Sequence, residues 1–345
     1  MAEGAPGAAM ARETAEAPEV VARLMRDCRP AVAELERLFT SRRPTHLVTS
    51  ARGSSDHAAH YLKYLCEILL GLPCASVGAS VASVYGARLD LEGCIVTAVS
   101  QSGASPDSLA FAAEVKRAGA PLITITNAAD SPLGRLADVP LVLGAGPEES
   151  VAATKTFIAS VALAARIIAA WAGSAEVVDA CERLPEALAR AASIAWPPLE
   201  DRLVGLGENA SLYVLGRGPA LAMAEEAALK LKETSGLHAE AYSTAEVVHG
   251  PMELIRPDFP VVLMAPPDAA AGTNRATAAR LRAAGAEVYI AGHEPGDLPT
   301  AATAHPLLDP IAMIQSFYGC ACRIAIRRGR DPDRPHLLSK VTRTL

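Results

Sequence analysis

The chain has 345 residues, of which 50% are hydrophobic and 20% charged, and its formal net charge is −6 at pH 7. This length suffices for one large or two ordinary globular domains, and the acidic balance argues against a general nucleic-acid-binding protein, because phosphate backbones attract a basic face. The seven cysteines lack the paired spacing of a zinc site and are interpreted as reduced, mostly buried thiols of a cytoplasmic protein.

The first 40 residues predict a helical segment ahead of the first domain. Residues 1–20 are small and acidic, and we expect them to fray. They lack the basic region followed by an apolar run that marks a secretory signal. Residues 20–40 carry apolar side chains at helical spacing, which predicts a helix there. We therefore expect 1–40 to form an N-terminal helical segment.

Residues 41–173 alternate apolar runs with amphipathic stretches, which predicts an α/β domain whose parallel sheet is covered by helices on both faces. The most apolar stretch, residues 156–172, contains Arg166 and is expected to be a buried helix rather than a membrane span. The predicted strands are residues 45–50, 94–100, 121–127 and 137–144, and the predicted helices lie within 51–71, 105–119 and 156–172.

The second half of the chain repeats the first. A helical linker rich in Ala, Arg and Glu is expected at residues 174–205, after which the pattern restarts. Gly53 and Gly218 are 165 positions apart, and so are Gly71 and Gly236. Further along, Ala118-Gly119-Ala120 matches Ala284-Gly285-Ala286 at an offset of 166. Two offsets that differ by one residue across a whole domain indicate a tandem duplication of one α/β unit. The predicted organisation is therefore a first domain at 41–173, a second domain at 206–330 and a C-terminal tail at 331–345.

A loop rich in serine follows the predicted strand 94–100. Ligands of doubly wound sheets bind beyond the carboxyl ends of the strands, and free N–H groups at the start of a helix favour an anion. The hydroxyls of Ser100, Ser102 and Ser105 add neutral donors, and Gly103 is expected to let the backbone approach the ligand. The alternative is that these serines merely cap the following helix.

Two more serines, Ser54 and Ser55, hold the equivalent position after the preceding strand. The chain lacks a P-loop lysine and a G-x-G-x-x-G turn, so neither a nucleoside triphosphate nor a dinucleotide is indicated. The pattern favours a single phosphate monoester. The predicted phosphate-binding residues are Ser54, Ser55, Ser100, Gln101, Ser102 and Ser105.

Six segments together resemble the SIS (sugar isomerase) family, and their order and spacing are most similar to the isomerase half of glutamine–fructose-6-phosphate aminotransferase. The resemblance covers roughly residues 40–345. It implies two tandem SIS domains, a sugar-phosphate substrate, no cofactor or metal, no nucleic-acid or membrane partner, and a homodimer with shared active sites. The segments are ARGSS (51–55), SQSGASPDSL (100–109), SVAATKTF (150–157), ALKLKETSGLHAEAY (228–242), EVVHGPMELI (246–255) and LLSKVT (337–342).

The resemblance also implies three catalytic residues. Glu233 matches the family's proton-shuttling glutamate, and His249 matches a ring-opening histidine that the neighbouring subunit supplies. Lys340 matches a lysine that forms a Schiff base with the open-chain sugar. On the residues alone, the alternatives are a solvated glutamate paired with Lys230 or Lys232 and a histidine on a turn with a structural role.

Further residues are implied at the sugar end of the substrate. Val151, Ala152 and Lys230 match contacts to the sugar. The apolar residues near Lys340 suggest that the tail is tucked against the protein; they are Leu337, Leu338 and Val341. In a deaminase the role of Lys340 stays open between contact with the opened sugar and transimination.

The sequence shows no cysteine-nucleophile glutaminase domain, so an internal ammonia source is not expected. The favoured function is therefore a SIS-type glucosamine-6-phosphate deaminase, which forms fructose 6-phosphate and ammonia. The alternatives are an isomerase or deglycase acting on another amino-sugar or fructosamine phosphate, glutamine-independent glucosamine-6-phosphate synthesis, and a sugar-phosphate-sensing regulator.

Overall fold

The computed structural model describes residues 4–292 and 297–340. The chain divides into two compact units. Of the described residues, the first-sheet unit comprises 19–148 and 155–182, and the second-sheet unit comprises 4–18, 149–154, 183–292 and 297–340. The helices α1 (Ala8–Asp27) and α7 (Ala175–Ala192) each contribute residues to both units.

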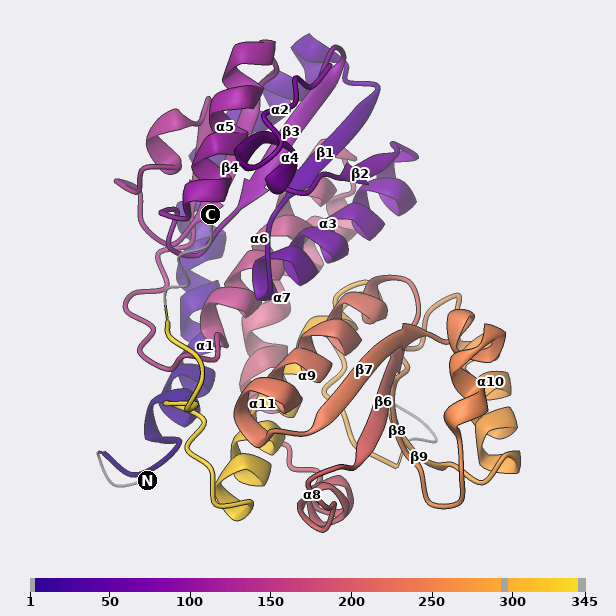
Figure 1. Ribbon diagram of the computed structural model, residues 1–345. Helices are drawn as coiled ribbons and strands as arrows, with labels where there is room; N and C mark the ends of the chain where they lie inside the picture. Colours follow the sequence, from indigo (N-terminus) through magenta and orange to yellow (C-terminus); the bar gives the residue numbers. More distant parts are fainter. Residues whose placement is uncertain (1–3, 293–296, 341–345) are drawn as a thin grey trace. The chain divides into compact units, whose positions relative to one another are not determined.

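The first-sheet unit contains a five-stranded parallel sheet in the order β2-β1-β3-β4-β5. Because the chain continues from the central pair β1 and β3 toward opposite edges, the topological switch point lies between these two strands. Figure 1 shows them side by side. The strands are β1 (His46–Ser50), β2 (Cys74–Ser76), β3 (Cys94–Val99), β4 (Leu122–Thr126) and β5 (Val139–Val142).

Helices cover both faces of this sheet. On one face, Phe111 and Val115 pack against Val48, Val96 and Leu122 in a fully apolar core. The expected apolar helix is α6, whose residues are nearly all buried, and no described helix is long and apolar enough to cross a bilayer. The helices are α2 (Arg29–Arg42), α3 (Ser54–Leu70), α4 (Ser80–Ser83), α5 (Pro106–Ala118) and α6 (Lys155–Trp171), with the 3-10 turn η1 (Gly134–Leu136).

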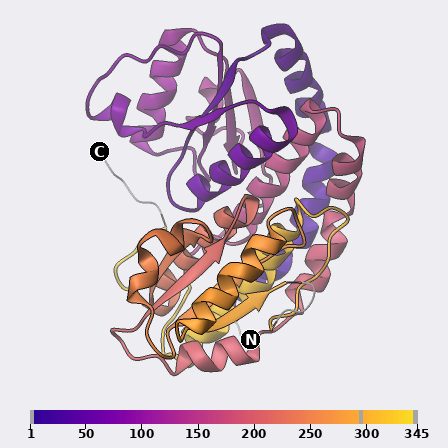
Figure 2. The same cartoon turned by 90° about the vertical axis from the view of Figure 1, so that its right-hand side faces the viewer.

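The second-sheet unit contains a parallel sheet in the order β7-β6-β8-β9, which repeats the first four positions of the other sheet. Helix α10 covers one face (Figure 2). There, Ala278 and Leu281 pack on Tyr213 and Leu215. The other face carries α9 and α11. The elements are α8 (Pro197–Val204), β6 (Ser211–Gly216), α9 (Pro219–Ser235), β7 (His238–Ser243), β8 (Pro260–Met264), α10 (Ala271–Ala283), β9 (Glu287–Ala291) and α11 (Asp309–Arg327).

The predicted duplication is confirmed at the level of backbone angles. Gly53 precedes α3 with φ 56° and ψ −137°, and Gly218 precedes α9 with φ 60° and ψ −138°. Gly71 and Gly236 end the same two helices in the left-handed region. Positive φ is readily accessible only to glycine, which has no Cβ atom. Both units therefore use glycine at the same two turn positions. The predicted fold class, two tandem doubly wound parallel α/β domains, is thereby confirmed.

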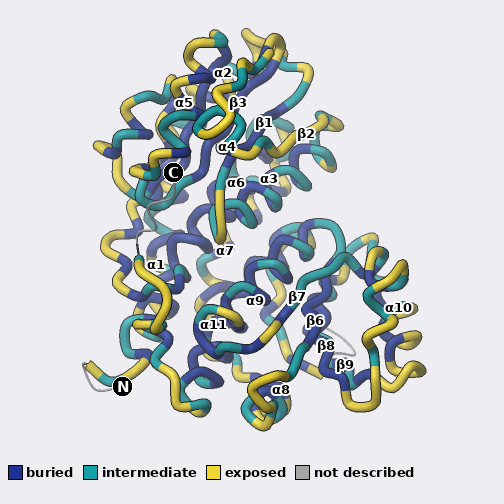
Figure 3. The backbone as a smooth tube through the Cα atoms, viewed as in Figure 1, coloured by how far each residue is buried: buried dark blue, intermediate teal, exposed yellow. Residues whose placement is uncertain are grey.

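One expectation about the N-terminal end of the chain was wrong. Residues 8–20 are not frayed, because they belong to α1, which begins at Ala8, and Met10, Glu13 and Ala17 are buried. The linker expected to be helical, residues 174–205, contains the two helices α7 and α8. The expectation that the cysteines are buried is confirmed, since all seven are free and buried. Figure 3 shows the central strands of both sheets in the colour of buried residues.

Candidate functional site

The serine loop is a backbone turn that is held in place by hydrogen bonds. The amide of Gly103 donates to Ser100 Oγ (3.2 Å), and the amide of Ala104 donates to Ser102 Oγ (3.4 Å). The carbonyl of Gln101 accepts from the amide of Asn127 (3.0 Å) in the loop that follows β4. The loop is thus held in place by contacts within the first-sheet unit.

Ser105 is the N-cap residue of α5, with extended backbone angles (φ −64°, ψ 127°), but its side chain makes no capping hydrogen bond. The helix-capping alternative assigned this hydroxyl to the first turn of α5. The side chain of Ser105 makes no hydrogen bond to that turn, and the residue is only half-buried. The hydroxyl therefore lies beside the positive end of a helix without satisfying that end itself.

In the structure, Gly103 is explained by its packing and backbone angle, whereas the sequence suggested the approach of a ligand. Its φ is +58°, and a Cβ at this position would lie 2.5 Å from Ser131 Oγ and 2.6 Å from Ser131 Cβ. Contact with Ser131, together with the left-handed backbone, accounts for the glycine. Close approach of a ligand is not needed to explain it.

The second pair of serines lies at the neighbouring strand end. Ser54 and Ser55 open α3, directly beyond β1, and β1 pairs with β3 so that Ser50 is opposite Ala98. An ion pair between Arg52 and Asp107, in the first turn of α5, links the two loops. The six predicted phosphate-binding residues thus gather at the switch point of the first sheet. Sequence reasoning missed Arg52, although a lone cation before two serines is a readable signal.

The corresponding strand end of the second sheet has different chemistry. Asp268 follows β8, accepts a hydrogen bond from the amide of Ala270 (2.8 Å), and burial raises the pKa of its carboxyl group. A carboxylate repels an anion, whereas serine hydroxyls donate to one. The two sheets share an architecture, but the hydroxyl-lined loop belongs to the first.

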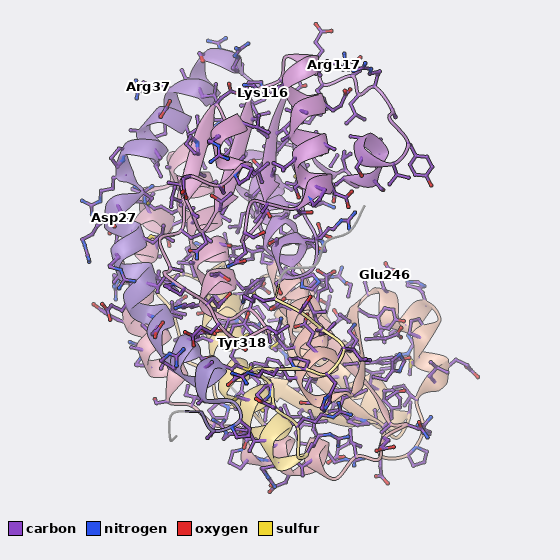
Figure 4. The ribbon with its side chains drawn as sticks, turned by 60° about the vertical axis from the view of Figure 1, so that its left-hand side comes forward. Asp27, Arg37, Lys116, Arg117, Glu246 and Tyr318 are labelled. Carbon is purple, nitrogen blue, oxygen red and sulfur yellow. The ribbon has the colours of Figure 1, made fainter. Side chains whose placement is uncertain are left out.

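Helix α9 carries a buried chain of ionisable groups. The Nζ atom of Lys230 lies 3.5 Å from Glu226 Oε1 and forms a second ion pair with Glu233. The Lys230 side chain is 1% exposed, that of Glu226 0% and that of Glu233 21%. Tyr318, in α11 (Figure 4), donates to Glu226 Oε1 at 3.2 Å. The pairing of Glu233 with Lys230 is present, but the lysine is buried rather than solvated, and Glu233 is the member that reaches the surface.

His249 lies on the exposed surface of the second-sheet unit. It is the last residue of the 3-10 helix η2 (Glu246–His249) rather than part of a free turn, and Gly250 and η3 (Pro251–Leu254) follow. Figure 4 labels Glu246, the first residue of this short helix. An exposed imidazole can exchange protons with a group that approaches from outside.

Lys340 contacts the segment that contains Val151 and Ala152. Its Nζ donates to the backbone carbonyl of Ser150 (2.6 Å). The amide of Val151 donates to the carbonyl of Asp333 (3.2 Å), and Ala152 is fully buried. A sugar contact at Val151 would therefore have to use its carbonyl or displace this bond.

The C-terminal segment is held by polar contacts, so the expected apolar anchoring is wrong. Leu337 and Leu338 are 96% and 46% exposed. The carboxylate of Asp333 instead accepts from the amides of Ala9 (2.9 Å) and Met10 (2.8 Å) at the start of α1. Free N–H groups at a helix start bind a carboxylate well, and this explains the anchoring. Val341, the third residue of that expectation, lies outside the described residues.

Comparisons with known proteins identify the family of the chain. The family model for the SIS domain matches residues 41–170 and 206–307, so the chain belongs to the SIS family. It is 37% identical, over 85% of its length, to glutamine–fructose-6-phosphate aminotransferase (isomerizing) of Aeropyrum pernix, of which it covers 50%. The chain spans about half the length of the curated relatives it matches.

Solved structures extend the relationship. A chain from Silicibacter pomeroyi DSS-3, provisionally assigned as a phosphosugar isomerase, is 44% identical with a TM-score of 0.88, covering 94% of this chain and 99% of that one. Glucosamine-6-phosphate deaminase of Thermotoga maritima shares the fold, with 21% identity and a TM-score of 0.78 over 98% of this chain and its own full length. The chain is thus a SIS-family protein related to phosphosugar isomerases and to the aminotransferase.

Proposed function

We propose that the chain is an amino-sugar-phosphate deaminase that converts glucosamine 6-phosphate and water into fructose 6-phosphate and ammonia. The observation that carries this proposal is the chain Glu226–Lys230–Glu233, in which two buried groups hold a carboxylate that is itself accessible. Moving a proton between neighbouring carbons needs one accessible carboxylate in a fixed orientation. The serine loop supports the assignment of a phosphate ester, because it offers neutral donors at a helix start.

The residues divide the chemistry as follows. Ser54, Ser55 and the loop 100–105 bind the phosphate. His249 of a partner subunit moves the hydroxyl proton that opens the ring. Glu233 transfers the C2 proton to C1 through an enolamine, and water then hydrolyses the C2 imine and releases ammonia. Lys230 orients Glu233, and Lys340 contacts the opened sugar near Val151 and Ala152. This scheme implies a cytoplasmic homodimer with shared sites.

A coupled assay of ammonia release tests the function. Purified protein is given glucosamine 6-phosphate, galactosamine 6-phosphate or a fructosamine 6-phosphate, each without glutamine. We expect ammonia and fructose 6-phosphate from the first substrate. Turnover of another substrate alone would transfer the assignment to the corresponding isomerase or deglycase, and binding without turnover of any would favour a sugar-phosphate sensor.

The residue roles are tested with Glu233→Gln. We expect turnover to fall by at least about 100-fold, the lower range for loss of a general acid–base group, with phosphate-ester affinity nearly unchanged. Glu208→Gln serves as the matched control, because Glu208 is an exposed glutamate of the same unit. Loss of binding together with turnover in Glu233→Gln would contradict the division of roles.

A further inference from the structure

We propose that Arg52 binds the phosphate group directly and makes the site selective for a phosphate ester over the neutral sugar. This inference rests on the proposed function, because it concerns the same site. It adds a cation to a loop that otherwise offers only hydroxyls and backbone amides. The residue lies two positions before Ser54, in the turn between β1 and α3.

The position of the guanidinium is set by its acidic partner. A terminal nitrogen of Arg52 pairs with Asp107 Oδ2, and the Asp107 side chain is only 1% exposed. Asp107 lies two residues beyond Ser105, in the first turn of α5. The ion pair therefore keeps the guanidinium at the start of the same helix that ends the serine loop. The Arg52 side chain stays 46% exposed, so it is accessible from solvent.

The local charge balance requires such a cation. A phosphate monoester carries about −1.5 to −2 charges at neutral pH, and a helix start offers roughly +0.5. Asp107 places a full negative charge in that same first turn, which outweighs the helix contribution. Serine hydroxyls carry no net charge to offset it. With Arg52 present, the carboxylate is neutralised and the helix start again favours an anion.

The shape of the guanidinium suits direct binding as well as neutralisation. Arginine presents five N–H donors in a planar fork that matches two phosphate oxygens. A lysine offers the same charge without the fork. If Arg52 only cancelled Asp107, removing both charges would leave the phosphate affinity intact. If it contacts the phosphate, removing both would still weaken binding.

The experiment measures binding of glucosamine 6-phosphate, inorganic phosphate and unphosphorylated glucosamine by calorimetry. The variants are Arg52→Met, Arg52→Lys and the double variant Arg52→Met with Asp107→Asn. Arg88→Met is the matched control, because Arg88 also pairs with a buried carboxylate of α5, Glu114, near that helix's other end. Melting temperatures establish that each variant is folded.

We expect Arg52→Met to weaken the binding of glucosamine 6-phosphate and inorganic phosphate by at least about 10-fold, as loss of a charge-assisted hydrogen bond does. Glucosamine binding and the Arg88→Met control should stay within about threefold of wild type, the scatter expected of a remote charge. The phosphate affinity of Arg52→Lys should be intermediate between those of wild type and Arg52→Met. If Arg52→Met does not fold, Arg52→Lys provides the test instead. The double variant should still bind glucosamine 6-phosphate and inorganic phosphate weakly.

Three outcomes would overturn the inference. Unchanged phosphate affinity in Arg52→Met and Arg52→Lys would remove Arg52 from the site. Full recovery in the double variant would reduce it to a partner of Asp107. Wild-type protein that binds neither phosphate compound would refute the phosphate site of the proposed function itself, so the two failures are distinguishable.

Discussion

Lys340 donates a 2.6 Å hydrogen bond from Nζ to the backbone carbonyl of Ser150, a residue 190 positions earlier in the chain. Both residues belong to the second-sheet unit. The bond joins the C-terminal segment to the residues just before Val151 and Ala152. The two segments that we assign to the sugar end of the substrate therefore meet at this bond and at the bond from the Val151 amide to the Asp333 carbonyl.

Replacing this lysine tests its assigned contact with the opened sugar. We expect Lys340→Met to lower kcat by roughly 10–100-fold, the loss of one or two charged hydrogen bonds. Affinity for inorganic phosphate should not change, because the serine loop belongs to the other unit. Lys232→Met, at an exposed lysine of α9, is the control. Wild-type turnover in Lys340→Met, measured by ammonia release, would remove Lys340 from the site.

Glu13 should act as a positioning residue for the same segment. Its buried carboxylate accepts from the amides of Glu149 and Ser150. We expect Glu13→Gln to lower the free energy of unfolding by about 1–3 kcal/mol, because a buried charged acceptor is lost. It should also lower kcat without changing phosphate affinity. Glu19→Gln, at an exposed glutamate of α1, should change neither, and an equal effect of both substitutions would refute the assignment.

Two glycines with nearly the same φ allow the cost of backbone strain to be measured apart from the cost of overpacking. Gly103 and Gly144 have φ +58° and +59°, but only at Gly103 would a Cβ meet Ser131. We expect Gly144→Ala to cost about 1–2 kcal/mol from the left-handed backbone alone. Gly103→Ala should cost about 1–3 kcal/mol more, because the added methyl overpacks. Urea unfolding measures both, and equal costs would show that Ser131 moves aside freely.

Glu114 should make stability depend on pH. The bidentate hydrogen bond from Arg117, followed by the amide of Leu89, lowers the pKa of the Glu114 carboxyl group from 4.5 to about 2. The unfolded chain therefore takes up this proton at higher pH than the folded one. The stabilisation is complete above pH 4.5 and is lost as the pH falls toward 2.

The comparison of wild type with Glu114→Gln tests this sign. We expect the variant to be less stable at pH 7, and the difference between the two proteins to shrink steadily below pH 4.5. Urea unfolding at pH 7, 5, 4 and 3 measures it, with Glu92→Gln as the exposed control. A difference that stays constant over this range would mean that the Arg117 contact does not favour the ionised form.

The duplicated architecture was predictable because its signals are local. Apolar runs between turn residues define β1, β3 and β4, and the glycine pairs that reveal the repeat are required by backbone angles that other residues adopt poorly. Short elements were missed, among them β2, which has three residues and a mostly exposed pattern. A strand of this length carries too few side chains for its period to be read.

The site was predictable in its residue types but not in its connections. The serine loop stands out in the sequence itself, and Glu233 and Lys340 are indicated by the family resemblance, whereas Arg52, Glu13 and the ends of the tail are not. Glu13 meets Glu149 across 136 positions, and Gly7 meets Asp331 across 324. Contacts over such separations leave no periodic trace, because each depends on one pair of groups that folding brings together.

By itself, then, the sequence determined the order of strands and helices, the duplication and the chemistry of the strand ends, since hydrophobic period and turn geometry act between near neighbours in the chain. Tertiary structure alone decided which charges far apart in the chain neighbour one another and which charged groups are excluded from water. It placed Arg52 against Asp107 and buried Lys230 between two carboxylates. The reason is that Coulombic and hydrogen-bonded partners are selected by their distance in space and by the exclusion of water. For residues far apart in the chain, the sequence does not specify either quantity.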